Sequence, residues 1–568
     1  MALQSDGQSH LAAFTTLVCP PSHGKLDAAM HDRIHTAPNG TPIQVILSVQ
    51  PGGLDPILGL IALLGGKVDA LHYGVSALTV EIGVGQIGLL AATPAILSLS
   101  IDAPLLEQRG VLPADLLAQR AAGGPAAPVT HLRETLGLDD QWTGAGVGVA
   151  VIDSGLELHA GMAGRVREFQ DFTGGGGPPD DDFGHGTHVA GLIGGRGTAD
   201  GRFQGVAPGV SFIVLKVLDA SGAGRTSDVI RAIEFATANK ARLGIDIINL
   251  SLGHPIYEPA ATDPMVRAVD AATRAGIVVV VSAGNYGTNP VTGLPGYAGV
   301  TSPANAASAI AVGALSTLGT TARSDDRVAT YSSRGPTWYD ARVKVDLSAP
   351  GDRLVAVAAR HSTLYRDYPA LHAGAGYMRL SGTSMAAGVV TGVAALMLEA
   401  SAAAHGGAHP ALTPNAIKAA LQYTAFAVGT NAGIPADVLT VGAGAINATG
   451  AIKWATGVDT SQPVGERWAT TNFVRTTVLA GETLAWSTSL LWGPLVVSGD
   501  VVETNQPAWA SAVVWGNTTT WGNAVVWGNT VVWGNTAVWS NAVVWGNHEL
   551  GVTDDNSVVW GNLYRAQP

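Results

Sequence analysis

From about residue 130 to residue 455, short apolar segments alternate with segments of helical periodicity. The apolar segments lack the in–out alternation of a half-exposed strand, so each is expected to be a strand covered on both faces. Such strands, separated by helices, predict a parallel sheet with helices on both sides, an α/β fold. The expected strands are Val147–Ile152, Phe212–Leu218, Ile245–Leu250, Ile277–Val281 and Ala309–Val312. The expected helices are Ser227–Asn239, Asp263–Ala275 and Thr413–Tyr423.

The chain has 568 residues, more than one core usually holds, so several folding units are expected. Segment 42–105 predicts a small α+β unit with strands at Ile43–Val49, Val75–Ile82 and Ile96–Ile101. A helix is expected at Asp55–Leu64, capped by Asp55. The other divisions are a flexible leader (1–41), a linker rich in Ala, Gly and Pro (106–129), the α/β unit (130–455), a connector (456–507) and a repeat region (508–568).

The repeat region is marked by tryptophans that recur every six residues from Trp509 to Trp545, mostly within Val-Val-Trp-Gly-Asn. Such a regular period indicates an array of identical structural units. A β-solenoid, a tight meander with Gly-Asn turns and an aggregation-prone disordered segment all remain open. We expect a stabilising β-appendage in preference to surface attachment, self-association or carbohydrate binding.

Composition excludes several classes of function. The net charge of −12 argues against a nucleic-acid-binding surface. Cys19 is the sole cysteine, which rules out an intrachain disulfide and a zinc-thiolate cluster. Apolar stretches such as Val389–Leu398 fall short of the ~18 residues that span a bilayer, so no membrane span is expected. Met1–Val18 has no clear signal-peptide pattern.

Three segments carry residues suited to nucleophilic catalysis. Asp153 ends an apolar strand, His185 opens an expected helix, and Ser384 precedes the helical run Met385–Glu399. A serine hydroxyl needs a base within hydrogen-bond reach, and that base needs a third group that fixes its tautomer. A helix start at Ser384 would also direct backbone N–H groups towards a developing oxyanion. One Asp, one His and one Ser on separate loops could supply this chemistry.

These segments resemble the signature motifs of the subtilases, the subtilisin-like serine endopeptidases. The matching blocks are Val-Ile-Asp153-Ser-Gly, Gly-His185-Gly-Thr-His-Val-Ala-Gly and Ser-Gly-Thr-Ser384-Met-Ala-Ala. The order Asp, His, Ser agrees with that of subtilisin. The resemblance covers about residues 130–455 and includes four further motifs: Gly205-Val-Ala-Pro208, Asn249-Leu-Ser-Leu-Gly253, Ser332-Ser-Arg-Gly-Pro336 and Ser348-Ala-Pro-Gly351. It implies a subtilisin-like sheet preceded by a small α+β propeptide domain. The repeat region lies outside the family's pattern, and its β-rich character is expected from the repeat itself.

The resemblance also implies a role for each catalytic residue. Ser384 would be the nucleophile, His185 the general base and then the general acid, and Asp153 the group that orients His185. The Asn285 side-chain amide, in Val280-Val-Ser-Ala-Gly-Asn285, would form the oxyanion hole together with the Ser384 backbone N–H. His188, the second histidine of its block, is expected to be structural.

The substrate-binding residues are also implied by the resemblance. Two segments would wall the P1 pocket, with Thr301 at its floor, and a third would pair with the extended substrate as an added strand. The walls are Ser251, Leu252 and Gly253, and Ser282, Ala283 and Gly284; the pairing segment runs from Gly222 to Gly224. Because these walls carry no carboxylate, broad specificity for apolar or aromatic P1 residues is expected.

No cofactor is required for this chemistry, although structural calcium is considered. Segment Leu156–Gly164 lacks the carboxylate that serves the family's strongest calcium site. Asp180, Asp181 and Asp182 are either calcium ligands or a solvated acidic loop. The sequence also departs from many subtilases at Gly388, where they have proline. Glycine there weakens the start of the helix.

The resemblance assigns segment 42–105 as a propeptide that chaperones folding and inhibits the enzyme, with autocleavage between Leu106 and Val129. The expected partners are therefore protein or peptide substrates and the chain's own propeptide. A long propeptide favours export, with a cytoplasmic location as the alternative. Two other functions are weighed: an adhesive protein with a vestigial protease unit, and an acid peptidase with a Ser-Glu-Asp site. The intact Asp153, His185 and Ser384 set with Asn285 argues against the first, and His185 with Asn285 argues against the second.

Overall fold

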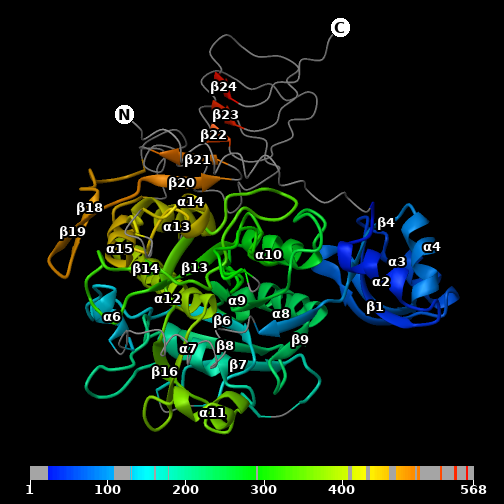
Figure 1. Cartoon of the computed structure of the whole chain (residues 1–568), viewed down its shortest axis with the longest axis horizontal. Coiled ribbons are helices and arrows are strands. Elements are labelled where there is room, and N and C mark those ends of the chain that lie inside the picture. Colours follow the sequence, from blue (N-terminus) through cyan, green and yellow to red (C-terminus); the bar gives the residue numbers. More distant parts are fainter. Residues whose placement is uncertain are drawn as a thin grey trace.

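The computed structural model describes residues 24–107, 128–129, 131–158, 161–176, 178–289, 292–406, 412–429, 435–459, 468–492 and 495–498, and three short strands further on. Figure 1 shows a small N-terminal unit beside a larger α/β unit, with the C-terminal hairpins lying over the latter. The two units correspond to the α+β and α/β segments expected from the sequence.

An eight-stranded sheet forms the centre of the α/β unit, in the order β14-β13-β12-β10-β6-β8-β7, with β15 paired to β13. Every pair is parallel except β13 with β14. The five strands expected from apolar runs are all present. The strands are β6 (Gly148–Asp153), β7 (Val166–Asp171), β8 (Ser211–Lys216), β10 (Ile247–Leu250), β12 (Val278–Ser282), β13 (Ile310–Ser316), β14 (Arg327–Val328) and β15 (Leu347–Pro350).

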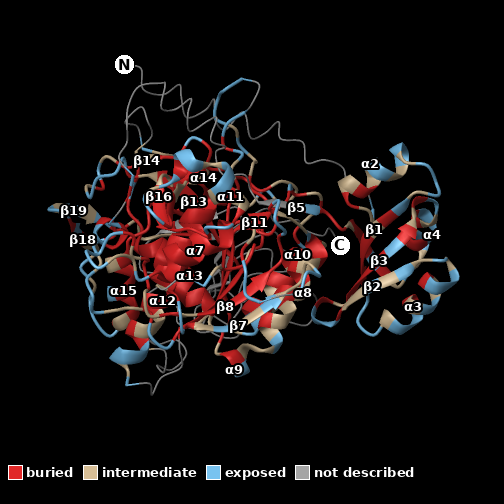
Figure 2. Cartoon of the chain, turned by 90° about the horizontal axis from the view of Figure 1, so that it is seen from below, coloured by how far each residue is buried: buried red, intermediate tan, exposed pale blue. Residues whose placement is uncertain are grey.

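The central strands are buried on both faces, which explains their continuous apolar sequences. In β6, Val149 and Val151 pack into one hydrophobic cluster, whereas Ala150 and Ile152 pack into the other. Successive side chains of a strand point to opposite faces, so both clusters draw on every inner strand. Figure 2 shows this buried centre beneath the helices.

Helices cover the two faces of the sheet. The helices packed in the cluster of Val149 and Val151 are α7 (His185–Gly194), α12 (Thr383–Ala404), α13 (Pro414–Thr424) and α15 (Ala448–Thr456). The helices packed in the cluster of Ala150 and Ile152 are α8 (Thr226–Ala238) and α10 (Pro264–Arg274). The remaining elements of this unit are α6 (Leu132–Thr135), α9 (Lys240–Leu243), β16 (Leu354–Val357), α11 (Thr363–Asp367), η3 (Pro369–Leu371), β17 (Tyr377–Leu380) and α14 (Val438–Val441).

Helix α12 is longer than the apolar run that suggested it. It spans 22 residues and, among the described residues, is the one helix long and apolar enough to cross a membrane. The sequence-based expectation that no segment reaches this length was therefore wrong, because small residues extend the helix on both sides of Val389–Leu398. Within the protein, 83% of its most apolar window is buried, as expected of a core helix.

The N-terminal unit contains a four-stranded antiparallel sheet in the order β2-β3-β1-β4. Its helices pack on one face through residues such as Met30 and Ile57, while Ile46 on the other face joins the cluster of α8 and α10. The elements are α2 (Ala28–Thr36), β1 (Pro42–Val49), α3 (Leu54–Leu63), β2 (Lys67–His72), η1 (Tyr73–Val75), β3 (Ala77–Gly83), η2 (Val84–Gln86), α4 (Ile87–Ala92) and β4 (Ile96–Ile101).

This unit differs from the expected one in two respects. It begins before residue 42, because Asp27 caps α2 by accepting a hydrogen bond from the Met30 N–H at 2.5 Å. The leader expected to be flexible therefore contains an ordered helix. Asp55 is not the N-cap of α3, which begins after Gly53; Asp55 lies inside the first turn.

The segment that follows β4 enters the α/β unit. Strand β5 (Pro104–Glu107) lies between β9 (Ala223–Arg225) and β11 (Leu252–Gly253) in a three-stranded antiparallel sheet. The expected boundary between residues 105 and 106 therefore cuts a strand. The rest of the expected linker up to residue 127 lies outside the described residues.

The expected connector folds onto the α/β unit, so the expected boundary at residue 455 lies within packed structure. Trp454 on α15 and Trp468 are both buried, with ring centroids 5.4 Å apart. Two hairpins follow, β18 (Thr476–Leu479) with β19 (Glu482–Ala485) and β20 (Ser489–Trp492) with β21 (Leu495–Ser498).

Most of the repeat region lies outside the described residues. Three short strands in it, β22 (Val525–Val526), β23 (Val543–Trp545) and β24 (Val558–Trp560), pair in parallel. A tight meander would pair neighbouring strands antiparallel, so the pairing of these three strands is that of a solenoid.

Candidate active site

Asp153 and His185 meet at the carboxyl edge of the central sheet. Asp153 is the last residue of β6 and His185 is the first of α7. The His185 Nδ1 atom lies 2.8 Å from Asp153 Oδ1 and 3.0 Å from Oδ2. Both side chains are almost fully buried. The carboxylate partner at Nδ1 places the imidazole proton on that nitrogen and leaves Nε2 as the basic nitrogen of the neutral ring.

Two glycines allow helix α7 to start in this position. Gly184 has a φ of 105°, and a Cβ there would lie 2.3 Å from Ser362 Oγ. A Cβ on Gly186 would lie 2.3 Å from the Gly155 carbonyl oxygen, in the turn after Asp153. A side chain at Gly186 would push the helix away from the end of β6, whereas one at Gly184 would be strained and would clash with Ser362. Gly186 therefore allows the close approach of His185 to Asp153.

Ser384 lies in the first turn of α12 and is buried. Its hydroxyl donates to the Ser251 carbonyl oxygen at 3.2 Å, and the Ser251 hydroxyl donates to the Ser384 carbonyl at 3.1 Å. Helix α12 packs against α7, where Gly388 faces Val189. The helices that begin with His185 and with Thr383-Ser384 are therefore direct neighbours.

Asn285 follows β12 and is bound to the residue before Ser384. Its Oδ1 accepts hydrogen bonds from the Thr383 backbone N–H at 3.0 Å and from the Thr383 hydroxyl at 3.1 Å. The Gly284 N–H donates to the same hydroxyl at 3.1 Å. Because Oδ1 faces Thr383, the Nδ2 amino group of the carboxamide points away from it. Thr383 was not singled out in the sequence, because Gly-Thr-Ser is common in turns.

The segments expected to bind substrate surround strand β5. Leu106 lies opposite Ala223 of β9 on one side and Gly253 of β11 on the other, and Glu107 lies opposite Leu252. Gly222, with a φ of 75°, abuts the Phe183 ring, and a Cβ on Gly224 would lie 2.3 Å from the Val217 carbonyl oxygen.

The residues expected at the P1 pocket are also brought together. The Thr301 N–H donates to the Ala283 carbonyl at 3.2 Å, and Thr301 is buried. A Cβ on Gly284 would lie 3.0 Å from the Thr301 methyl group. Ser282 ends β12 and is buried, and Ser251 touches Ser384. The two predicted walls and the predicted floor therefore lie next to Asn285 and Ser384.

The acidic loop before His185 is bound by protein groups. Asp181 is buried, and its carboxylate accepts from the Ser154 hydroxyl, the Gly184 N–H, and the N–H and hydroxyl of Thr187, at 2.6–2.8 Å. Asp182 pairs with Lys216 at 2.5 Å. Among the described residues, no group of three or more His, Cys, Asp or Glu side chains could hold a metal ion.

His188 lies on the buried side of α7. Its Nε2 is 3.1 Å from the Met378 carbonyl oxygen, and burial, together with the nearby His185, lowers its pKa to about 3. The imidazole is therefore neutral, and its contact is with the backbone of β17. This position agrees with the structural role expected for it.

The structure thus places the Asp153–His185 pair, a buried serine on the adjacent helix and the Asn285 carboxamide beside a parallel α/β sheet. Residues 144–445 match the model of the subtilase family, Peptidase S8. The chain therefore belongs to the subtilase family and is a subtilisin-like serine endopeptidase.

Individual relatives agree with this assignment. The chain is 36% identical over 333 residues to serine protease AprX of Bacillus subtilis, covering 58% of this chain and 71% of that protein. It is 32% identical over 388 residues to an extracellular serine proteinase of a Thermus strain, covering 66% and 78%. The crystal structure of fervidolysin from Fervidobacterium pennivorans, a keratinolytic enzyme related to subtilisin, has a TM-score of 0.54 and 22% identity, covering 77% of this chain and 64% of that one.

Proposed function

We propose that Ser384, His185 and Asp153 form the catalytic triad and that the protein is made as a self-processing zymogen. The observation that carries the proposal is the Asp153–His185 pair at 2.8 Å. His185 begins helix α7, which packs against α12, the helix that carries Ser384 in its first turn. The neutral imidazole bound in this way presents Nε2 as a base. The buried carboxylate then stabilises the imidazolium that forms when the serine proton is transferred.

In the proposed reaction the Ser384 oxygen attacks the carbonyl carbon of the substrate while Nε2 of His185 takes the hydroxyl proton. The Asn285 Nδ2 group and the Ser384 N–H donate to the oxygen that becomes negative. The imidazolium then donates its proton to the leaving amine, and water hydrolyses the acyl-enzyme with His185 again acting as base. The orientation of Asn285 supports this role, because Thr383 holds the opposite end of its carboxamide.

The N-terminal unit acts in this proposal as an intramolecular inhibitor. Its last described strand, β5, pairs on both sides with the segments expected to bind substrate. A tethered strand competes for the cleft at a high effective concentration. Glu107 lies opposite Leu252, and the next residue of that segment is Ser251, which touches Ser384. The proposed processing point is therefore one or two residues beyond Glu107, within the expected interval from Leu106 to Val129.

The proposed specificity is broad and leans towards apolar side chains. The predicted P1 walls and floor contain only small or apolar side chains and hydroxyl groups. Leu105 on β5 is fully buried in the same cluster as Val229 and Ile230 of α8, which favours an apolar residue at that substrate position as well. Cleavage profiling that found a strict preference for basic P1 residues would contradict this proposal.

We further propose that the enzyme works outside the cell on protein or peptide substrates and needs no cofactor for its chemistry. The extracellular location is supported by the name of the Thermus relative. The carboxylates of Asp181 and Asp182 already have protein partners, so the acidic loop gives no support to a calcium site there. The repeat region is proposed to be a stabilising β-appendage, which the parallel pairing of β22, β23 and β24 supports.

The experiment is to express the wild type, Ser384→Ala and Ser401→Ala, and to measure the intact mass and the new N-terminus of each. Ser401 is a second buried serine on α12 and serves as the matched control. The expected result is loss of the N-terminal region shortly after Glu107 in the wild type and in Ser401→Ala, with Ser384→Ala remaining full length. If all three remain intact, or all three are cut at the same bond, self-processing by Ser384 is refuted.

A further inference from the structure

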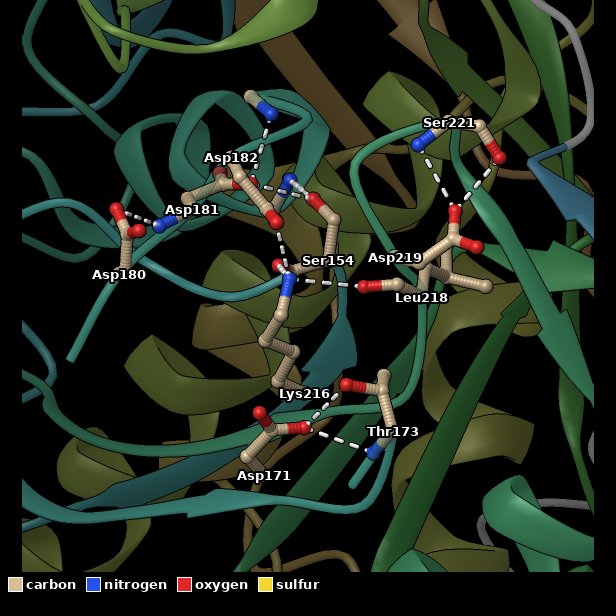
Figure 3. A network of polar contacts seen from close by, with 12 residues as sticks. Ser154, Asp171, Thr173, Asp180, Asp181, Asp182, Lys216, Leu218, Asp219 and Ser221 are labelled. Atoms are coloured by element: carbon tan, nitrogen blue, oxygen red, sulfur yellow. Dashed lines mark hydrogen bonds and ion pairs between the residues drawn. The ribbon is translucent and has the colours of Figure 1, made fainter. Parts of the chain in front are cut away.

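Lys216 is a buried lysine beside the proposed triad. It is the last residue of β8 and lies opposite Asp153 in the pairing of β8 with β6. Its Nζ donates to the Ser154 carbonyl at 2.7 Å, to the Leu218 carbonyl at 2.9 Å and to Asp182 Oδ1 at 2.5 Å, as Figure 3 shows. An ammonium group has three donors, and here each of them has an oxygen acceptor.

The three acceptors lie on three different loops. Ser154 follows Asp153 at the end of β6, and Asp182 lies in the loop that leads to His185. Leu218 begins the turn towards β9, where Asp219 accepts hydrogen bonds from the N–H groups of Ser221 and Ala223. Desolvating an ammonium ion is unfavourable by several kcal/mol unless acceptors surround it. Moving any of these loops would break a bond to a buried charge, so Lys216 resists such movement.

The contact with Ser154 reaches the proposed triad directly. The Ser154 N–H donates to Asp153 Oδ1 at 2.7 Å, the same oxygen that lies nearest to His185 Nδ1. The Ser154 hydroxyl accepts from the Gly186 N–H at 2.9 Å, at the start of α7. Ser154, whose carbonyl Lys216 holds, therefore contacts both the Asp153 carboxylate through its N–H and the start of the helix that carries His185 through its hydroxyl.

We propose that Lys216 is a positioning residue for catalysis, a tethered cation that holds the Asp153–His185 pair in register with the substrate-pairing strand β9. The ammonium occupies a cage of two carbonyls and one carboxylate, oxygen ligands of the kind a hard metal cation uses. This inference rests on the proposed function, because it assigns the Asp153–His185 pair to catalysis. Lys216 itself touches none of the reacting atoms.

The positioning role predicts an effect on rate and on pH dependence. In Lys216→Met the side-chain length is kept but the ammonium is lost, so Ser154 and its neighbours become free to shift. A misplacement of about 1 Å at a catalytic group can lower the rate by roughly 10²-fold. The charged groups labelled around Lys216 are Asp171, Asp180, Asp181, Asp182 and Asp219. His188, on the same helix as His185, is neutral because its pKa is lowered to about 3. Removing the Lys216 charge takes a cation away from the surroundings of the pair, which favours protonated His185.

The test measures kcat, KM and the pH profile of the processed enzyme on a neutral chromogenic peptide, with active sites counted by an irreversible serine-directed titrant. For Lys216→Met we expect kcat to fall roughly 10- to 100-fold, with a smaller change in KM. We also expect the acidic limb of the kcat/KM profile to move to higher pH. Lys216→Arg keeps the charge, so it should recover part of kcat and leave the acidic limb near its wild-type position.

Two controls separate positioning from general stability. Lys344 is also a buried lysine, bound to Asp346 at 2.6 Å, and it lies outside the loops of the proposed triad. Lys344→Met should lower the thermal midpoint without moving the acidic limb. Asp182→Asn removes the carboxylate but leaves both carbonyl partners, and its side chain is 45% exposed, so a smaller loss of kcat is expected than for Lys216→Met.

The outcomes are decisive in both directions. An unchanged kcat and pH profile in folded Lys216→Met overturns the inference, as does an identical shift of the acidic limb in Lys344→Met. If Lys216→Met fails to fold, the Asp182→Asn variant decides: a wild-type kcat and pH profile in that variant then overturn the inference, whereas the expected smaller loss of kcat supports it. A wild-type enzyme that is inactive, or whose activity survives in Ser384→Ala, would instead overturn the proposed function.

Discussion

Asp102 of the N-terminal unit caps helix α8 of the protease unit through Ser227. The Asp102 Oδ1 atom accepts from the Ser227 N–H and Oδ2 accepts from the Ser227 hydroxyl, both at 2.9 Å. The first turn of a helix has N–H groups with no partner in the helix, and a carboxylate is well suited to satisfy them. The start of α8 is thus completed by a residue that lies just before β5.

This contact predicts that Asp102→Ala weakens the docking of the N-terminal unit. Loss of a helix cap is unfavourable by about 0.5–2 kcal/mol. After self-cleavage the N-terminal unit should therefore dissociate sooner, and the lag before full protease activity should shorten. Asp69→Ala is the matched control, because Asp69 pairs with Lys67 inside the N-terminal unit. An equal lag in Asp102→Ala and the wild type would contradict the prediction.

A second part of the same interface predicts pH-dependent docking. Asp27 of the N-terminal unit and Glu258 of the protease unit are both buried, and the Ser100 hydroxyl donates to Glu258. Burial, with Asp263 and Asp27 nearby, raises the pKa of Glu258 to about 8, and burial raises the pKa of Asp27 to about 6. Two further charged groups act electrostatically here: Arg267 on Glu258, and Asp340 on Asp263.

The sign of the effect follows from proton binding. The docked carboxyl groups keep their protons at pH values where separated ones, with ordinary pKa values of 3.8 and 4.5, would have lost them. Docking is therefore strongest below the ordinary pKa values, weakens as the pH rises above them, and stops weakening above about 6 for Asp27 and above about 8 for Glu258. The activation lag should shorten as the pH rises towards about 8 and then level off, and Glu258→Gln should remove most of that dependence. A lag that lengthens with rising pH would refute this account.

The surroundings of Gly388 predict that its substitution by alanine stabilises the protein. A Cβ at this position would lie 3.5 Å from the Val189 carbonyl and 3.6 Å from the Leu192 Cβ, which are ordinary contacts. Glycine inside a helix is less stable than alanine by roughly 0.5–1 kcal/mol. Gly388→Ala in the Ser384→Ala background should therefore raise the thermal midpoint. Gly186→Ala, whose Cβ would lie 2.3 Å from a carbonyl oxygen, should lower it sharply.

The proposed role of Asn285 predicts that Asn285→Ala lowers kcat with little change in KM. Removing one oxyanion donor typically lowers kcat by about 10²–10³-fold. Asn285→Ala should show such a loss in steady-state kinetics, because the amide acts on the oxygen that becomes charged during attack. Asn289→Ala in the following loop, where Asn289 Oδ1 accepts from the Thr292 N–H, is the control and should keep wild-type kcat. A KM effect without a kcat effect in Asn285→Ala would assign the residue to binding alone.

Much of the fold could be predicted because a strand buried on both faces has a continuous apolar sequence. The inner strands are continuous apolar runs, whereas β2 was missed because Lys67 and Asp69 give it a polar, partly exposed pattern. Helix α2 was missed because it is short and carries few apolar residues. The helix bounds of α8, α10 and α13 agree with their expected positions within about two residues.

The candidate site residues were predicted from sequence motifs. The residues that the motifs did not explain are held by contacts between segments far apart in the chain. Asp181 and Asp182 looked like a calcium cluster or a solvated loop, because no local pattern reveals that their partners are Thr187, Ser154 and Lys216. A lysine at the end of a strand usually faces solvent. The burial of Lys216 arises because three loops close over it, and nothing in its immediate sequence indicates that closure.

The most direct test of the central claim is covalent labelling of the processed enzyme with a fluorophosphonate, followed by mass spectrometry of its peptides. The account predicts a single adduct on Ser384, with a labelling rate that collapses in His185→Ala and falls strongly in Asp153→Asn. Labelling at another residue, or an equal rate on Ser384 without the imidazole, would contradict it.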